Sequence, residues 1–369
     1  MVRAAAAFIR AEWFLAVAAA TSLAFLLPPA GLPGDLASPV RLALVFAWLF
    51  AAVLGSALAV VRHADHLAVR MGEPYGTLIL TLSVTFIEVI SISAVMVHGE
   101  LHATLARDTL FSVVMIILNL MVGLSLLVGG WKHREQVYNL QGANTYLGVI
   151  IPLVVLSLVL PTYTQTTPGP TLSPAQQIFL VVMSVGIYAA FLRIQTGRHR
   201  DYFALGDDGA DEAEPHSAAG ACTFHAILLL AYMAPVAVLA EQMAVPLNYL
   251  VETFHMPAPF GGVIIAILVA TPEAVGAVRA ALADRLQRSI NIALGSVLST
   301  ISLTVPAIVL LSRFMGIDIV LGVQNTDTVL LVLTLGVSVV TFASGRTNVM
   351  QGLVHLILFV VYLLLIVEG

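Results

Sequence analysis

The sequence has little charge and almost no cysteine. Only 10% of its 369 residues are Asp, Glu, Lys or Arg, whereas 59% are hydrophobic. A soluble globular protein has about 25% charged residues, so this chain lacks the polar surface that a soluble fold of its length needs. The single cysteine, Cys222, excludes an intramolecular disulfide framework and a metal site built from several cysteines. The composition therefore predicts an integral membrane protein.

Other absences narrow the class of function. The 16 Lys and Arg residues form no basic block, so nucleic acid is not an expected partner. The chain has no Gly-x-x-x-x-Gly-Lys-Ser/Thr phosphate loop, no Gly-x-Ser-x-Gly elbow and no His-Glu-x-x-His helix. ATP-driven pumping and hydrolysis therefore have no visible machinery, and we expect neither a cofactor nor an enzyme.

Long apolar segments recur along the whole chain. A transmembrane helix needs about 20 predominantly apolar residues, which is longer than the roughly ten-residue strands of a membrane barrel. We therefore predict an all-α polytopic membrane protein with about eleven transmembrane helices. The predicted spans are residues 11–29, 40–61, 77–97, 109–130, 144–163, 174–194, 223–243, 258–279, 290–312, 327–344 and 348–367.

The first span and the basic residues determine the predicted orientation. The first span follows Arg3 and Arg10, as a signal peptide would, but its Pro28-Pro29 end does not favour cleavage, so we expect an uncleaved helix. Cytoplasmic loops are enriched in Lys and Arg. If the N-terminus is cytoplasmic and the spans alternate, every basic residue falls in a cytoplasmic segment except Arg41, Arg107 and Arg313. The C-terminus is then on the opposite side.

The longest polar stretch separates two groups of five spans. It begins with Arg198-His199-Arg200 and becomes acidic from Asp207 to Glu214. Such a run is either a solvated linker or a regulatory segment, because clustered carboxylates raise the local concentration of cations. We predict a first-helix segment at 1–35, five-helix repeats at 36–195 and 223–369, and a cytoplasmic acidic linker at 196–222.

A Pro-aromatic-Gly motif occurs once in each group of five spans. Pro74-Tyr75-Gly76 begins fourteen residues before Glu88, and Pro259-Phe260-Gly261 begins fourteen residues before Glu273. The predicted topology orients the two copies oppositely across the membrane. Inverted repeats are a transporter architecture, with the substrate site near the midplane. The spacing therefore predicts a lone first helix followed by two inverted five-helix repeats.

Glu88 and Glu273 are the main candidate site residues. An ionised carboxylate within a membrane helix costs about 2.5 kcal/mol or more, and such residues usually mark ion or proton pathways. Pro272 precedes Glu273 and removes a backbone donor, and a helix broken there would expose carbonyl oxygens to a cation. The alternative for each glutamate is a structural carboxyl group hydrogen-bonded to a neighbouring helix.

Neutral oxygen donors surround these glutamates in the sequence. Two carboxylates with hydroxyl and amide oxygens make a site for a hard cation such as Ca²⁺. Equal counting from Arg107 and Arg288 sets Asn119 opposite Thr300. The candidate neutral ligands are Ser83, Thr85, Asn119, Thr271, Ser296, Ser299 and Thr300, although Ser and Thr also pack helices together in membranes. Glu73, Glu241 and Glu252 are candidates for lining an entrance.

The same two carboxylates can bind protons. When the cation leaves, two negative charges in a low-dielectric site cannot both persist, so protonation replaces the cation. This competition predicts a cation/proton antiporter whose partners are inorganic cations, protons and membrane lipid. A cation channel built on the same carboxylates is one alternative. An intramembrane enzyme that uses them as acid and base is the other, although no nucleophile or metal-binding triad is visible.

Several motifs resemble one known family. They are the stretch Gly72–Leu80 leading to Glu88, the segment Asn139–Asn144, and Ala270–Glu273 with the stretch from Leu294-Gly295-Ser296 through Pro306. These motifs resemble the bacterial ChaA-type calcium/proton antiporters of the cation/calcium exchanger superfamily. The resemblance implies exchange of Ca²⁺, and in some members Na⁺ or K⁺, for protons across the bacterial inner membrane.

The resemblance also implies roles for particular residues. It carries the two acidic positions of the superfamily onto Glu88 and Glu273, and the positions of the following helix onto the neighbourhoods of Asn119 and Ser296/Ser299. The superfamily has a Gly-Asn-x-x-Glu-like signature in each repeat. This chain has Ser83-Val84-Thr85 and Val269-Ala270-Thr271 instead, which implies hydroxyl ligands in place of an amide and affects ion selectivity more than the exchange mechanism.

Overall fold

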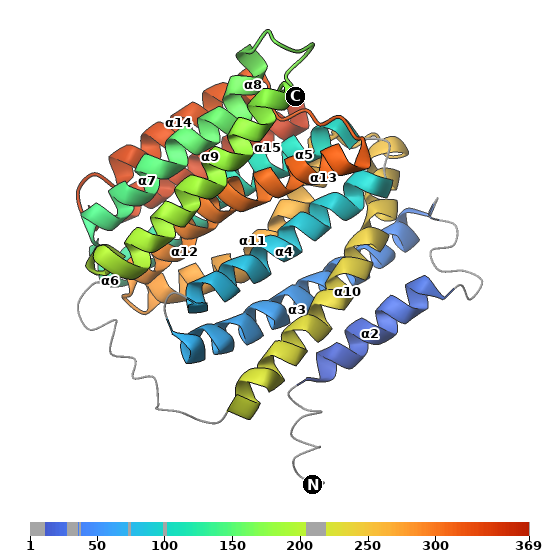
Figure 1. Ribbon diagram of the computed structural model, residues 1–369, viewed down its shortest axis with the longest axis horizontal. Helices are drawn as coiled ribbons and strands as arrows, with labels where there is room; N and C mark the ends of the chain where they lie inside the picture. The colour runs from blue at the N-terminus through green and yellow to red at the C-terminus, as the bar shows by residue number, and fades with distance from the viewer. Residues whose placement is uncertain are drawn as a thin grey trace. The chain divides into compact units, whose positions relative to one another are not determined.

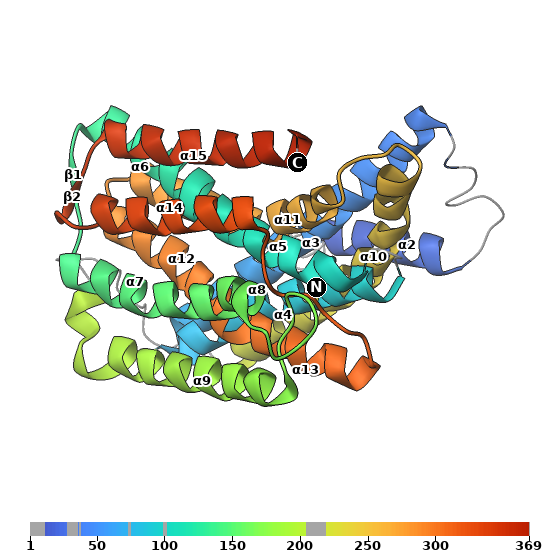
Figure 2. The same ribbon diagram turned by 90° about the horizontal axis from the view of Figure 1, so that it is seen from above.

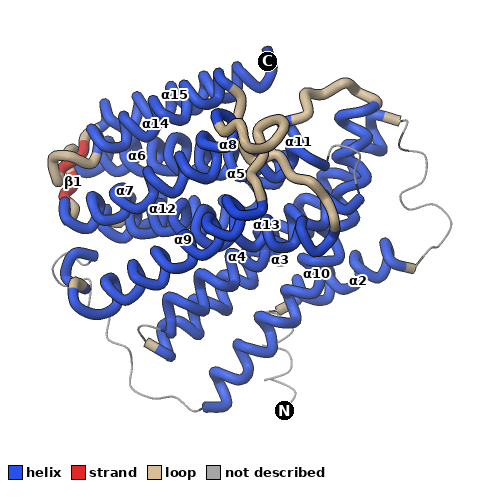
Figure 3. The backbone as a smooth tube through the Cα atoms, turned by 45° about the horizontal axis from the view of Figure 1, so that its top comes forward, coloured by secondary structure: helices blue, strands red, loops and turns tan. Residues whose placement is uncertain are grey.

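The described structure is almost entirely helical. The computed structural model describes residues 12–27, 36, 38–72, 75–98, 102–203 and 219–368. Strand structure within these ranges is limited to the pair β1 (Gln136–Val137) and β2 (Arg346–Thr347) (Figure 3). Nine described helical segments are long and apolar enough to cross a membrane, and Trp13–Leu26 and Asn325–Thr341 are shorter apolar helices. These segments coincide with the predicted spans, so the predicted all-α polytopic membrane fold is confirmed.

Local sequence determines where these helices begin. Ser173 precedes α9 (Pro174–Arg193) and forms a capping box, because its hydroxyl accepts from the Gln176 backbone N–H and the Gln176 side chain accepts from the Ser173 N–H. Asn139 similarly precedes α7 (Leu140–Val154) and accepts from the backbone N–H groups of Gln141 and Gly142. These caps satisfy donors that would otherwise lack partners at the helix ends.

The first of two compact units comprises Met1–Glu100 and Glu214–Met256. Its helices are α2 (Trp13–Leu26), α3 (Pro39–Met71), α4 (Tyr75–His98) and α10 (Ala219–Glu252). In this unit α3 and α10 pack along each other, and α4 packs against both (Figure 1). His63 near the end of α3 contacts His225 near the start of α10, so these two helices run antiparallel. They lead the two sequence repeats, and their opposite directions agree with an inverted arrangement.

The second unit comprises Leu101–Ala213 and Pro257–Gly369. Its long helices lie side by side (Figure 2). Several contain short π-helical segments, and the label η is used for these segments and for one 3₁₀ turn. Besides α7, α9 and the 3₁₀ turn η4 (Arg200–Phe203), its elements are α5 (His102–Met115), η1 (Ile116–Met121), α6 (Val122–His133), η2 (Val155–Val159), α8 (Leu160–Tyr163), η3 (Ile194–Arg198), α11 (Pro259–Leu282), α12 (Leu286–Ser299), η6 (Thr300–Thr304), α13 (Val305–Met315), α14 (Asn325–Thr341) and α15 (Val349–Glu368).

The loops of the second unit gather at two opposite ends. At one end β1 pairs with β2, and Gln136 Nε2 donates to the Ala281 carbonyl at the end of α11, with a separation of 2.9 Å. At the other end the Val320 N–H donates to the Ala103 carbonyl at 2.7 Å, and the Val323 N–H donates to the Leu158 carbonyl at 2.8 Å. Successive membrane-length segments of this unit therefore alternate in direction, as predicted.

Two glycines allow α6 and α15 to approach closely. A Cβ atom on Gly352 would lie 2.6 Å from the Leu127 backbone nitrogen and 2.8 Å from the Gly123 carbonyl oxygen. A Cβ atom on Gly123 would in turn lie 2.9 Å from the Leu356 side chain. Helices in membranes associate through such small residues, because close backbone approach increases van der Waals contact.

We predict that Gly352→Ala destabilises the protein by about 1–3 kcal/mol, the usual cost of overpacking a tight contact. The thermal unfolding midpoint in detergent should fall, because the added methyl group forces α15 away from α6. Gly186→Ala on α9 is the matched control, since a Cβ atom there meets nothing within 4 Å. Equal midpoints for the two variants would contradict the close-contact explanation.

Candidate functional site

Glu88 lies on α4 in the first unit and is only 1% exposed. Thr85 and Ser91 lie one turn before and after it and are also buried, because residues three apart share a helix face. The Thr85 hydroxyl has no hydrogen-bond partner among the described residues and could therefore serve as an oxygen ligand. Ser83 is placed differently, because its hydroxyl donates to the Ile79 carbonyl of the same helix at 2.7 Å.

Glu273 lies half-buried on α11 in the second unit. Ser296 on the adjacent helix α12 donates its hydroxyl to Glu273 Oε2. The Ser299 hydroxyl donates to the Ser296 carbonyl at 2.9 Å, and Ser296, Ser299 and Thr300 are all buried. The structure thus brings the predicted carboxylate of this repeat together with a predicted hydroxyl ligand. A hydrogen bond to an ionised group is roughly twice as strong as one between neutral groups, so Ser296 orients the Glu273 carboxylate.

Besides η2 and η3, π-helical backbone occurs in each of the two helices that follow the glutamates. Both α5 and α12 are 14 residues long, and each passes directly into a π-helical segment, η1 or η6. Such segments are rare and occur frequently at functional sites. Asn119 lies within η1, and Thr300 begins η6. Counting from these two helix starts sets Asn119 opposite Leu303, one turn beyond the predicted partner Thr300.

The predicted break at Pro272 is wrong, because α11 is continuous from Pro259 to Leu282. Membrane helices tolerate proline when nearby groups and small backbone adjustments compensate for the missing N–H. The Thr271 hydroxyl donates to the Ile267 carbonyl of the same helix at 2.5 Å. Thr271 therefore supports its own helix, whereas Ser296 supplies the hydroxyl that reaches Glu273.

Asn119 belongs to a buried network in the second unit. Its Nδ2 donates to the Thr334 hydroxyl on α14 at 3.0 Å, and its Oδ1 lies 3.3 Å from His355 Nδ1 on α15. His355 Nε2 lies 3.0 Å from the Thr341 hydroxyl. A neutral His355 that is protonated at Nδ1 satisfies both contacts, since it then donates to Asn119 and accepts from Thr341. The network fixes the orientation of the Asn119 amide, whose role as an ion ligand stays a prediction.

The remaining predicted acidic residues are more peripheral. Glu241 is half-buried on α10, and Glu252 is exposed where that helix ends. Glu73 lies outside the described residues. No group of three His, Cys, Asp or Glu side chains suited to a resident metal ion occurs in the part of the chain that the structure describes.

A buried ion pair on α5 was missed in the sequence. Arg107 Nε and Nη2 donate to Asp108 Oδ1 at 2.8 and 2.7 Å, and both side chains are buried. A Cβ atom on Gly262 of α11 would lie 2.7 Å from the Asp108 backbone, so α11 packs directly against this point. The adjacent opposite charges of Arg107 and Asp108 within an apolar segment could have indicated an ion pair. In the sequence, Arg107 served only to assign topology and to align the two repeats.

Comparisons with known proteins agree with this architecture. The family model described as "Sodium/calcium exchanger protein" matches residues 41–197 and 224–367. The sodium-potassium/proton antiporter ChaA of Escherichia coli (strain K12) is 40% identical over 318 residues, covering 85% of this chain and 86% of that protein. The Ca(2+)/H(+) antiporter ChaA of Bacillus subtilis (strain 168) is 24% identical over 343 residues, covering 91% and 96%. The predicted resemblance to ChaA-type proteins is confirmed.

Solved structures share the fold. The structure of native YfkE superposes with a TM-score of 0.74 at 22% identity, covering 98% of this chain and 99% of that one. The crystal structure of the H⁺/Ca²⁺ exchanger CAX gives a TM-score of 0.65 at 15% identity, covering 97% and 89%. The chain therefore shares the fold of these solved structures.

The buried ion pair generates a stability prediction. Asp108→Asn should destabilise the protein by about 3–5 kcal/mol, because it leaves the Arg107 charge buried without its counter-charge. Glu135→Gln is the control, since the Glu135 and Arg346 side chains form an exposed ion pair at 3.9 Å, which is worth about 0–1 kcal/mol. Chemical denaturation in detergent measures both, and a similar small effect of the two substitutions would argue against a structural role for Asp108.

Proposed function

The chain belongs to the sodium/calcium exchanger protein family, and from this membership we propose that it is a secondary active cation/proton antiporter. The proposed substrate is Ca²⁺, exported in exchange for protons, with Na⁺ and K⁺ as further substrates. Relatives named for sodium-potassium/proton and for Ca(2+)/H(+) exchange support both kinds of cation. With hydroxyl oxygens in place of the superfamily amides, the proposed ligands are all oxygen atoms, which both divalent and monovalent hard cations can use.

The contact between Glu273 and Ser296 is the observation that carries this proposal. It places an acidic side chain and a hydroxyl ligand together on two packed helices, immediately before the π-helical segment η6. Glu88 occupies the equivalent position of the first repeat, fourteen residues after the same Pro-aromatic-Gly motif, and is almost fully buried. An ionised carboxylate removed from water requires a counter-ion or a proton. We assign both carboxylates to one transport cycle, in which each binds the cation and protons alternately.

The proposed setting is the bacterial inner membrane, with a cytoplasmic N-terminus and a periplasmic C-terminus. The distribution of Lys and Arg supports this orientation. The proposed organisation has a first helix at 1–35, repeats at 36–195 and 223–369, and a cytoplasmic acidic linker at 196–222. In support of it, the family match is interrupted between residues 197 and 224, where the linker is proposed. In this setting an inward proton gradient drives cation export.

Proton flux in everted membrane vesicles tests the function. Addition of CaCl₂, NaCl or KCl to energised vesicles containing the wild-type chain should release protons, because cation uptake into the vesicle is coupled to proton efflux. Glu88→Gln and Glu273→Gln should each abolish this response while the protein stays folded, since glutamine keeps the shape and removes the titrating charge. Glu135→Gln, at an exposed glutamate outside the membrane-length helices, is the matched control and should respond normally.

Two outcomes of this assay would contradict the proposal. Normal exchange by either intramembrane glutamine variant would remove that glutamate from the mechanism. Cation flux without coupled proton movement in the wild type would instead favour the channel. Folding is checked independently by the elution profile of each detergent-solubilised variant.

The Glu273–Ser296 contact predicts a change in cation affinity. Ser296→Ala should raise the cation concentration for half-maximal exchange by about tenfold or more, because a hydrogen bond to a charged group contributes about 1.5–3 kcal/mol. Ser312→Ala is the matched control, since it makes the same substitution at a buried serine of α13 whose hydroxyl donates to the Val309 carbonyl of its own helix at 2.9 Å. Titration of exchange rate against cation concentration distinguishes them, and equal half-maximal concentrations for the two variants would show that Ser296 does not organise the site.

A further inference from the structure

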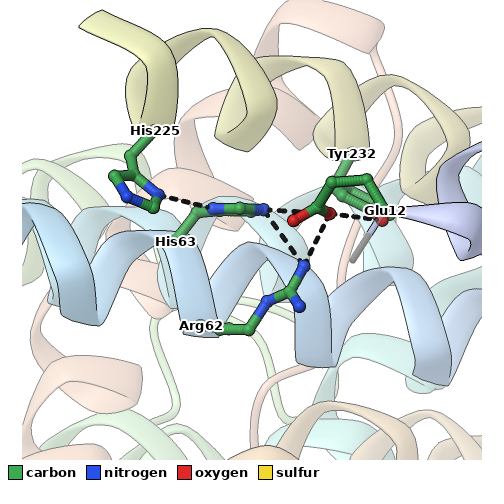
Figure 4. A network of polar contacts seen from close by, with 5 residues as sticks. All are labelled: Glu12, Arg62, His63, His225 and Tyr232. Carbon is green, nitrogen blue, oxygen red and sulfur yellow. Dashed lines mark hydrogen bonds and ion pairs between the residues drawn. The ribbon is translucent and has the colours of Figure 1, made fainter. Parts of the chain in front are cut away.

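A cluster of polar side chains in the first unit has no part in the proposed exchange. It comprises Glu12 at the start of α2, Arg62 and His63 on α3, and His225 and Tyr232 on α10 (Figure 4). The family match begins at residue 41 and therefore does not include Glu12 or α2. The cluster thus connects an additional helix to two helices of the family fold.

One carboxylate oxygen is the centre of the cluster. Arg62 Nη2 donates to Glu12 Oε2 at 2.6 Å, and the Tyr232 hydroxyl donates to the same oxygen at 3.0 Å. His63 Nε2 lies 3.4 Å from it. Glu12 is 8% exposed and His63 is 1% exposed, and a buried carboxylate is stable only when such partners are present. Glu12 therefore fastens the start of α2 to both α3 and α10.

The two histidines share one proton. His63 Nδ1 and His225 Nδ1 face each other at 2.9 Å, which is the distance of an N–H···N hydrogen bond. With no proton on either nitrogen, two lone pairs would face each other, and with a proton on both, two N–H groups would collide. A neutral pair and a singly charged pair both satisfy the contact. A pair of imidazolium ions does not, so uptake of a further proton breaks it.

The surrounding charges add to this constraint. The groups that act electrostatically on the two imidazoles are Glu12, which attracts a proton, and Arg62, His66 and Arg70, which repel one. The other titratable groups on the packed helices are Arg41 and the exposed Asp65 on α3, Tyr75 and Glu88 among the described side chains of α4, and Cys222, Tyr232, Glu241, Tyr249 and Glu252 on α10. His66 is exposed, and its ring stacks on that of His225 with centroids 4.7 Å apart. His225 is itself partly exposed, so solvent protons can reach the pair directly.

We propose that His63 and His225 form a proton-binding site, separate from the transport carboxylates, that releases α2 and the start of α10 from α3 when both imidazoles become charged. Because α4 packs against both α3 and α10, this release loosens the packing around the helix that carries Glu88. The site is thus a pH sensor for the helices next to one proposed transport residue. Its structural change can be measured without any assay of exchange.

The single cysteine provides a probe without further engineering. Cys222 lies on α10 three residues before His225 and is partly exposed. A nitroxide spin label attached to it at pH 8, in the full chain reconstituted in lipid vesicles, reports the mobility of this end of α10. Histidine changes charge between pH 8 and pH 5. Over this range the wild-type spectrum should change from that of an immobilised label to that of a mobile label.

Two variants separate the histidine pair from other effects of pH. His225→Gln can still hydrogen-bond to His63 but cannot take up a proton, so its spectrum should stay immobile at pH 5. His255→Asn is the matched control, because His255 is exposed beyond the far end of α10 and has a positive φ of 54° that asparagine tolerates. This control should keep the wild-type transition.

A second measurement uses the unlabelled protein. Amide hydrogen exchange of α2, corrected for its intrinsic dependence on pH, should accelerate at pH 5 in the wild type and not in His225→Gln. A transition that persists in His225→Gln would overturn the proposal. A wild-type chain without any transition in either measurement, or loss of the transition in His255→Asn, would overturn it as well.

Discussion

The structure depends on one constraint, which is that polar groups on membrane-spanning helices must find partners where water is scarce. Main-chain groups meet this constraint by forming helices, and side chains meet it by bonding to a neighbouring helix. Glu273 bonds to Ser296, Asn119 to Thr334 and His355, and Asp108 to Arg107. Each contact fixes the relative position of helix segments and also places a polar atom in an apolar surrounding. The contacts that hold the helices together therefore also determine where polar atoms lie in the apolar interior.

The spans and the repeat could be predicted because both follow from local composition and spacing. Runs of apolar residues mark the helices, and the repeated interval between a Pro-aromatic-Gly motif and a glutamate marks the duplication. The sequence indicated Ser296 as one of several candidate ligands but not its contact with Glu273. That contact depends on which faces of α11 and α12 pack against each other. The joint action of Glu88 and Glu273 stays a prediction.

Other features have no clear signal in the sequence. Proline suggested a break in α11, but the helix is continuous, and the π-helical segments η1 and η6 contain no proline or glycine within their own bounds. A π-helical turn is stabilised by surrounding contacts more than by its own residues, so local sequence rules do not find it. The cluster around Glu12 joins side chains up to 220 positions apart. Only the folded arrangement of α2, α3 and α10 shows that these residues meet.

The short strand pair has a mechanical consequence for the second unit. β1 lies in the loop after α6 and β2 in the loop before α15, so each proposed repeat contributes one strand. The Gln136 side chain connects this strand pair to the end of α11 by donating to the Ala281 carbonyl. Gln287 of α12 accepts from the Asn139 N–H at 2.6 Å. A hinge motion that separated β1 from β2 would have to break the hydrogen bonds of the strand pair and those of Gln136 at the same time. If the strand pair stays intact during a conformational change, the helix ends that it connects must move together as a rigid body.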